Sequence, residues 1–258
     1  MGGVVVHGVA GRRAEYRPLR SCLAADPQPA TVARGLIDSL DLSEFYVADL
    51  DAIGGGEPDW ATYDALINAG GRLWVDAGVS NLNRAAALKQ FADDRLAVTG
   101  IIVASESLAS PDCLGEFVAM LGSGRLIFSL DLLAGEVRMA IPQGREIYAS
   151  GTSPRRRLGS SPGHPDTPSL QWVADVVASG IRRLIVLDVA AVGLGQGCPT
   201  LDLCRELRRR YSDLEITSGG GIRTMADIEQ LTVAGCDNAL VATALHNGRI
   251  GRAELTVV

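Results

Sequence analysis

Residues 45–56 read Phe-Tyr-Val-Ala-Asp-Leu-Asp-Ala-Ile-Gly-Gly-Gly, and residues 184–195 read Leu-Ile-Val-Leu-Asp-Val-Ala-Ala-Val-Gly-Leu-Gly. Two further segments repeat in the same order: residues 75–80 parallel 218–223, and residues 100–108 parallel 238–245. The three matches lie between 138 and 143 residues apart. A half-barrel that is duplicated and closed on itself would give such a pattern. We therefore expect one domain over residues 1–258, built from two related halves.

Short apolar runs alternate with longer segments of helical periodicity along the whole chain. Most of these runs are apolar on both faces, which is typical of buried parallel strands. Eight strands with intervening helices predict a (β/α)8 TIM barrel, with an open doubly wound sheet as the alternative. The expected strands are Val4–His7, Phe45–Asp49, Arg72–Asp76, Gly100–Ala104, Arg125–Asp131, Leu184–Val189, Leu214–Ser218 and Asn238–Ala242.

The composition is that of a soluble globular chain of 258 residues with a formal charge of −6. An acidic chain does not attract phosphate backbones or anionic lipids, so it predicts neither a nucleic-acid-binding nor a membrane protein. The five cysteines form no CxxC pair, and we expect reduced thiols in a cytoplasmic location. Lys89 is the single lysine, so a lysine Schiff base could form only there. Arginine is therefore the side chain available to bind phosphate or carboxylate groups.

A glycine-rich segment follows the seventh expected strand. In barrels of this type the loops after strands 7 and 8 commonly form a phosphate site. Backbone amides of Ser218, Gly219, Gly220 and Gly221 can approach an anion closely, and the helical turn beginning near Thr243 would complete the site. The sequence therefore predicts a phosphate cradle here, although a glycine triplet is also an ordinary turn.

The equivalent positions of the first half give a weaker candidate for a second anion site. Gly78 and Ser105 would supply its donors. Asp76 stands where the second half has a neutral residue, and its charge would repel a phosphate.

The repeat, the Asp49-Leu50-Asp51 segment, Ser218-Gly219-Gly220 and the ending at residues 244–250 (Ala-Leu-His-Asn-Gly-Arg-Ile) resemble the HisA/HisF family. The similarity covers nearly the whole chain and is strongest from Arg182 to Ile250. HisA is the phosphoribosylformimino aminoimidazole carboxamide ribotide isomerase of histidine biosynthesis. The resemblance implies a duplicated barrel that grips a substrate with a phosphate at each end. It also implies an Amadori rearrangement that uses no cofactor.

The resemblance also implies an acid and a base, which in the family are aspartates at the ends of strands 1 and 5. Asp131 keeps the second carboxylate, while His7 stands in place of the first. Histidine can act as a base near neutral pH, so we take both as catalytic candidates, although His7 could equally be a ligand contact or a buried ring. Asp49 and Asp188 would be structural or substrate-binding, and we expect no metal.

Further departures from the family lie around the expected barrel mouth. Leu187 replaces a threonine, and the Gly-Trp of the family's fifth loop is missing. Residues 142–166 form a long loop instead, rich in glycine, proline and serine. The guanidinium groups of Arg155, Arg156 and Arg157 at its centre suit a lid over an anionic ligand, and a solvated loop is the alternative.

Two hypotheses follow. The first is a HisA-type isomerase that uses Asp131 and His7. The second, which the departures favour, is a divergent member that binds another phosphorylated or polyanionic small molecule, either as an altered enzyme or as a non-catalytic partner. HisA-like genes of this kind occur beside tetrahydromethanopterin and methanofuran genes in some bacteria, so one-carbon cofactor metabolism is a specific candidate.

Overall fold

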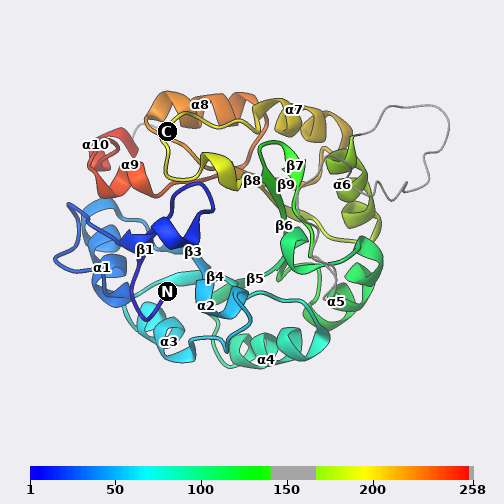
Figure 1. The fold of residues 1–258 in the computed structure, drawn as a ribbon, viewed down its shortest axis with the longest axis horizontal. Helices are drawn as coiled ribbons and strands as arrows, with labels where there is room; N and C mark the ends of the chain where they lie inside the picture. The colour runs from blue at the N-terminus through cyan, green and yellow to red at the C-terminus, as the bar shows by residue number, and fades with distance from the viewer. Residues whose placement is uncertain (141–166, 256–258) are drawn as a thin grey trace.

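The main sheet of the protein is nearly closed into a barrel. The computed structural model describes residues 1–140 and 167–255. The hydrogen-bonded path runs β3-β4-β5-β6-β8-β9-β10, and every neighbouring pair on it is parallel. Figure 1 shows these strands as a ring enclosed by helices. The strands are β3 (Glu44–Ala48), β4 (Arg72–Asp76), β5 (Val98–Ala104), β6 (Leu126–Leu133), β8 (Arg183–Asp188), β9 (Glu215–Gly219) and β10 (Asn238–Leu240); the short β7 (Glu136–Val137) pairs antiparallel with β6.

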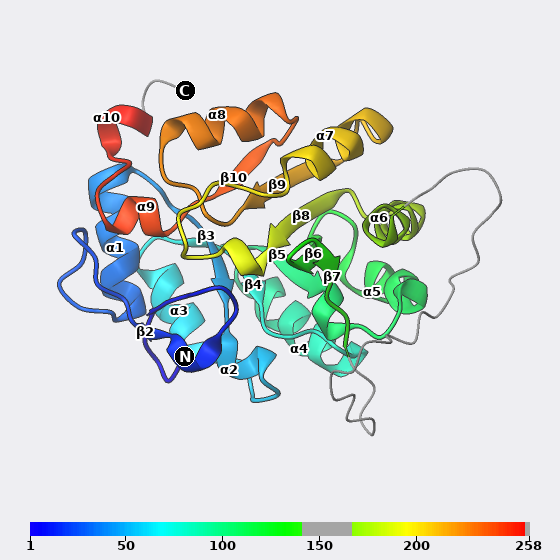
Figure 2. The ribbon, with the colours of Figure 1, turned by 45° about the horizontal axis from the view of Figure 1, so that its top comes forward.

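Helices alternate with the strands and cover the outside of the ring (Figure 2). The longer ones are α1 (Pro29–Leu40), α3 (Trp60–Asn68), α4 (Leu82–Asp93), α5 (Leu114–Leu121), α6 (Pro168–Ala178), α7 (Leu201–Arg210) and α8 (Met225–Val233). The one-turn helices are α2 (Leu50–Ile53), α9 (Thr243–His246) and α10 (Arg252–Leu255), with 3-10 turns η1 (Arg13–Glu15), η2 (Ser105–Ser107), η3 (Pro111–Cys113) and η4 (Val189–Ala191).

The predicted (β/α)8 architecture is confirmed. Local signals fix the helix starts: Thr167 caps α6 with Pro168 in the first turn, and Thr224 and Asp227 form the capping box of α8. The two copies of the repeat also fold alike, since Asp49 caps α2 after β3 and Asp188 caps η4 after β8. The duplication of a half-barrel stays a prediction.

The first expected strand differs from the prediction. Only Val6–His7 is extended, as β1, and it pairs antiparallel with β2 (Arg17–Pro18) instead of joining β3 or β10. The backbone of Val5 is already engaged, because its amide donates to Pro27 and its carbonyl accepts from Leu19. The N-terminal segment therefore packs as a hairpin on the apolar cluster at the seam between β3 and β10, to which Val5, Phe45 and Ala239 contribute.

Side chains alternate between two apolar layers. Inside the ring, the buried set is Trp74, Ile102, Ile127, Ile185 and Leu187. The other face of the same strands packs against the helices, where Phe128 stacks on Trp172 with ring centroids 5.9 Å apart. Because side chains on a strand alternate, Ser129 and Asp131 share the inner face of β6 with Ile127.

Arg183 closes the amino-terminal end of the barrel. It lies at the start of β8, donates to the carbonyl of Thr99 at 3.0 Å and pairs with Glu215 at 3.2 Å. Its guanidinium carbon lies 4.9 Å from the ring centroid of Trp74, whose indole N–H donates to Glu44 at 3.1 Å. Arg183, Glu215 and Glu44 thus cover Trp74 at the amino-terminal ends of the strands. The other end of the barrel, where the strands have their carboxyl ends, is therefore where a ligand site is expected.

The remaining features bear on the predictions from composition. All five cysteines are free thiols. Lys89 lies in an ion pair with Asp93 on α4, so the one lysine is on the outer helical layer. Among residues 1–140 and 167–255, no helix is long and apolar enough to cross a membrane.

We expect Arg183→Ala to lower the free energy of unfolding by about 2 kcal/mol. The value lies below the roughly 3–5 kcal/mol of a fully buried pair because the arginine side chain is 17% exposed. Urea unfolding of the variant measures this. Arg209→Ala, which removes an ion pair whose arginine is 70% exposed, should lower the stability much less than Arg183→Ala does; equal losses in both variants would contradict the role of Arg183.

Candidate functional site

The carboxyl ends of the parallel strands meet at the open end of the barrel, which we call the mouth. Polar residues follow directly at these ends: Asp49, Asp76, Ser105, Asp131 and Asp188. All five are buried. The structure therefore places most of the predicted site residues at the mouth, but their hydrogen bonds show that they have different roles.

Asp49 is committed to the backbone of its own loop. One carboxylate oxygen accepts from the Ala52 amide at 3.1 Å, and the other accepts from the Asp59 amide at 2.9 Å and the Tyr63 hydroxyl at 2.6 Å. Burial opposes ionisation, but these hydrogen bonds outweigh it and lower the pKa of Asp49. The carboxylate thus anchors α2 and α3, in line with the structural alternative expected for it.

Asp188 is the equivalent anchor of the second half. It accepts from the amides of Ala134 at 3.0 Å, Gly135 at 2.8 Å and Ala190 at 3.0 Å. Two of these donors form the turn between β6 and β7. Asp188 therefore holds the β6–β7 hairpin against the β8 loop, and its oxygens are used within the protein.

The glycine loop after β9 has the shape of an anion cradle. Gly220 and Gly221 adopt φ angles of +83° and +85°, a left-handed conformation that favours glycine. At Gly219 a Cβ would lie 2.5 Å from the carbonyl oxygen of Leu240. Within the described residues, the amides of Gly221 and Thr243 donate to no other group, whereas the Gly220 amide adjoins the β9–β10 ladder. The loop after β9 and the start of α9 thus present backbone donors at the mouth.

Side chains contribute little to this loop. The Ser218 hydroxyl is fully buried and donates to the Val186 carbonyl at 2.7 Å, next to Thr200 at 2.6 Å. Arg223 pairs with Asp227 at 2.8 Å. Of the predicted set, Ser218 therefore stabilises the strand from inside, and the donors without a partner in the described residues belong to the backbone.

The first-half anion site has its donors engaged. The Gly78 amide donates to the Asp76 carboxylate at 3.1 Å, and the Ser105 hydroxyl accepts from the Asp131 amide at 3.0 Å. A Cβ at Gly78 would lie 2.7 Å from Ile53 Cα, so this loop packs directly on α2. The first half therefore lacks the free amides that the second half offers.

Asp76 and Asp131 form a carboxyl pair in the mouth. The Tyr46 hydroxyl donates to Asp76 at 3.3 Å, and the Ser129 hydroxyl donates to Asp131 at 2.9 Å. Burial, the nearby charge of Glu106 and only partial compensation by Gly78 and Tyr46 raise the pKa of Asp76 to about 6. Burial, Asp76 and Glu106 raise the pKa of Asp131 well above its usual range. A carboxyl group with a raised pKa at a mouth is suited to proton transfer.

Sequence reasoning missed the neighbours of this pair. Tyr46 is half-buried on β3, and desolvation with the charge of Asp76 raises its pKa well above the usual value. Glu106, on η2, forms an ion pair with Arg138 at 2.6 Å. The repeated segment holds the one available signal, because Tyr46 stands where the second copy has the apolar Ile185. A hydroxyl that occurs at this inner-face position in the first half, but not in the second, indicates that the first half has a polar partner for it.

His7 lies toward the second half of the mouth. Its Nε2 is 3.4 Å from where a Cβ of Gly193, in the β8 loop, would stand. It also contributes, after burial, to lowering the pKa of His246. His246 is only half-buried at the surface, and its Nδ1 is 3.0 Å from the Ser21 hydroxyl. No contact joins His7 to Asp131 among the described residues, so an acid–base pair of these two stays a prediction.

Two other predictions concern the rest of the mouth. Arg155, Arg156 and Arg157, with the whole predicted 142–166 loop, lie outside the described residues. No group of three or more His, Cys, Asp or Glu side chains within residues 1–140 and 167–255 could hold a metal ion.

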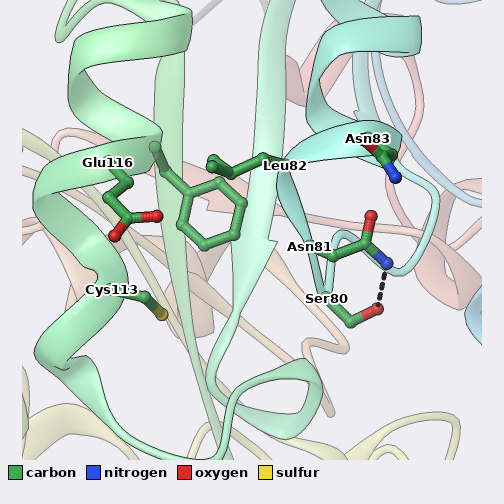
Figure 3. Close-up of a pocket in the computed structure, with 7 residues that line it drawn as sticks. Ser80, Asn81, Leu82, Asn83, Cys113 and Glu116 are labelled. Carbon is green, nitrogen blue, oxygen red and sulfur yellow. Dashed lines mark hydrogen bonds between the residues drawn. The ribbon is translucent and has the colours of Figure 1, made fainter.

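A separate pocket of about 380 Å³ opens on the outer layer, between the start of α4 and α5 (Figure 3). It is lined by Ser80, Asn81, Leu82, Asn83, Cys113, Glu116 and Phe117. Asn81 caps α4 by accepting from the Arg84 amide at 3.0 Å. The side chains that line this pocket thus serve helix packing, and the carboxyl pair is not among them.

A family model described as "Histidine biosynthesis protein" matches residues 1–251. The chain belongs to this family. It is 26% identical over 235 residues to a phosphoribosyl-imidazole-4-carboxamide isomerase of Lactiplantibacillus plantarum, covering 90% of this chain and 87% of the relative. An isomerase of the same name from Halobacterium salinarum is 28% identical over 211 residues, covering 81% and 76%. An uncharacterized protein of Methanocaldococcus jannaschii is 26% identical over 259 residues, covering 98% and 92%.

We expect Asp76→Asn to stabilise the protein at pH 8 by about 3 kcal/mol, at roughly 1.4 kcal/mol for each unit of the raised pKa. Because the folded-state pKa lies above the unfolded value of 3.8, the contribution of Asp76 to stability is complete below pH 3.8 and is lost as pH rises through about 6. Urea unfolding at pH 4.5 and pH 8 should show the gain growing with pH.

Asp64→Asn is the matched control, since Asp64 is half-exposed and pairs with Arg95 outside the barrel. That variant should show no gain as pH rises. A difference between Asp76→Asn and wild type that is the same at both pH values would contradict the assignment.

Proposed function

We propose that this chain is a divergent isomerase-type barrel that binds a phosphorylated small molecule at the loops after β9 and β10. Asp131 then transfers a proton to the bound molecule. The observation that carries this proposal is the buried Asp131 carboxyl at the mouth, whose second oxygen has no hydrogen-bond partner within the described residues. The free amides of the glycine loop stand on the same mouth and supply the anion grip. No step of this chemistry requires a cofactor.

The first half of the mouth supports an altered ligand. The family's substrate, as the resemblance implies, carries a phosphate at each end. Here the Gly78 amide and the Ser105 hydroxyl are engaged, and the buried Asp76 carboxyl stands at the mouth without a close cation. A second phosphate would be repelled from this side. We therefore infer a ligand with one phosphate and an uncharged or cationic far end.

The second candidate is the unaltered isomerisation of an aminoaldose ribotide to an aminoketose ribotide. It is favoured by the match over residues 1–251 and by isomerase names among the relatives. In this case Asp131 would be the acid or the base, and His7, or Arg155–Arg157, would have to complete the site.

A place in one-carbon cofactor metabolism rests on the resemblance alone and is a hypothesis. A cytoplasmic location is a second hypothesis, which rests on the composition of the chain. Deleting the gene separates the candidates. A histidine requirement would favour the ribotide isomerase. Loss of growth on one-carbon compounds with normal histidine synthesis would favour the altered enzyme.

We expect Gly220→Asp to weaken binding of inorganic phosphate at least about fivefold, because a like charge about 4 Å from the anion costs about 1 kcal/mol even in water. A thermal-shift titration with phosphate at constant ionic strength measures this. Gly220→Asn is the control, since it carries the same backbone strain and the same approach to Leu187 without the charge. Equal phosphate affinity in the two variants would refute the cradle.

We expect Asp131→Asn to lower kcat at least about a hundredfold, the lower end of what a positioned acid or base contributes. Turnover of the aminoaldose ribotide, followed by absorbance, tests the second candidate directly. If wild type turns this substrate over and Asp131→Asn is equally fast, the proton-transfer role is wrong. If wild type shows no turnover and does not rescue an isomerase-deficient histidine auxotroph, the second candidate is excluded.

A further inference from the structure

Two carboxyl groups face the same barrel mouth without a cation of their own. Asp76 is 4% exposed and Asp131 is 5% exposed. Their hydrogen-bond donors are neutral: the Gly78 amide and Tyr46 hydroxyl for Asp76, and the Ser129 hydroxyl for Asp131. The second oxygen of Asp131 has no hydrogen-bond partner in the described part of the chain and keeps some accessible surface, since it is not among the fully buried unpartnered atoms there.

The charged groups around the pair do not neutralise it. Glu106 approaches from η2, Arg138 from the end of the β6–β7 hairpin and Arg13 from η1. Arg138 is paired with Glu106 at 2.6 Å, and Arg13 donates to the Leu50 carbonyl at 3.4 Å. Tyr46, on β3, is the remaining titratable neighbour. One of the three carboxyl groups is thus matched by a close cation, and the other two are not.

Two buried carboxylates that feel each other's charge cannot both ionise cheaply, so one proton is retained between them over the neutral range. The retained proton belongs to the pair, because the groups titrate together. In the family, by the resemblance, the partner of the strand-end aspartate of β6 is an aspartate on the first strand. Here that strand is the outlying β1 with His7, while Asp76 and Asp131 lie on the inner face near the carboxyl ends of β4 and β6, the two strands that flank β5.

We propose that Asp76 and Asp131 share one proton at neutral pH, and that Asp131 delivers this proton to the substrate while Asp76 acts as the positioning residue that keeps it there. The catalytic part rests on the proposed function. In an aminoaldose isomerisation the proton passes from Asp131 to the ring oxygen as the carbon–oxygen bond breaks, with its electron pair going to that oxygen. The proton removed from the neighbouring carbon in the next step returns to the pair and restores the starting state.

The sharing is tested without any substrate. Carboxyl ¹³C resonances of aspartate-labelled protein, assigned through Asp76→Asn and Asp131→Asn, are followed from about pH 4 to about pH 9. In Asp76→Asn the Asp131 resonance should titrate at least about one pH unit lower than in wild type, because the like charge has been removed. An Asp131 midpoint that is unchanged in this variant overturns the proposal.

Tyr46→Phe provides a second variant should Asp76→Asn fold poorly. It removes the hydroxyl that stabilises the Asp76 carboxylate, so the Asp76 midpoint should move to higher pH. Asp64→Asn, outside the barrel, should leave both midpoints in place. A Tyr46→Phe protein with an unmoved Asp76 midpoint would also count against the pair.

Kinetics then test the catalytic part. With a substrate that wild type turns over, the alkaline limb of the kcat–pH profile should move to lower pH in Asp76→Asn, with KM nearly constant. A purely structural role for Asp76 would lower kcat equally at all pH values, which would overturn the positioning role. If wild type turns over no ribotide, the isomerase candidate fails while the titration still decides whether the proton is shared.

Discussion

The filled interior of the barrel is the constraint on which the other features depend. Trp74 and four aliphatic residues occupy the inside of the ring, and Arg183 closes it beneath the indole. Polar side chains on the inner face lie at its margin toward the carboxyl ends of the strands. Tyr46 and Ser129 stand in register with Trp74 and Ile185 of the layer, and their hydroxyls donate to Asp76 and Asp131 beyond it. Their mutual influence follows from the lack of space and water between them.

The two halves use the same repeated frame for different chemistry. Asp49 and Asp188 occupy equivalent strand ends, and each accepts three hydrogen bonds that hold its own loop. One strand further on, the halves diverge. The second half has Gly221, whose amide has no acceptor in the described residues, while the first half has Asp76, which accepts from the Gly78 amide. Asp76 stands at the position of Gly219 in the repeat, and its carboxylate makes this loop of the first half a hydrogen-bond acceptor where the second half offers backbone donors.

Much of the fold could be predicted from sequence because its signals are local. Apolar runs, the Thr167-Pro168 start and the Thr224 capping box act over a few residues. The fate of Val4–His7 could not, since it depends on hydrogen bonds to Pro27 and Leu19 and on a seam formed by distant strands. The same division holds for the site. Its strand-end carboxylates follow apolar runs and can be found in the sequence. The hydrogen bond of the Ser218 hydroxyl to the Val186 carbonyl, and the positions of Tyr46 and Glu106 near the carboxyl groups, depend on packing between strands, which a single sequence does not reveal.

The position of Lys89 has a practical consequence. It is the one primary amine on a side chain, and it lies near the carboxyl-terminal end of α4, at the opposite end of the helical layer from the mouth. Amine-directed coupling above neutral pH would therefore attach the protein to a surface or a dye through Lys89 and the chain's own amino group alone. A molecule immobilised through Lys89 would present its mouth away from the support, whereas the amino group of Met1 lies on the mouth side, next to Gly2 and its hydrogen bond to Asp51. Coupling through Lys89 in preference to the amino terminus would therefore orient this barrel for surface-based ligand screening.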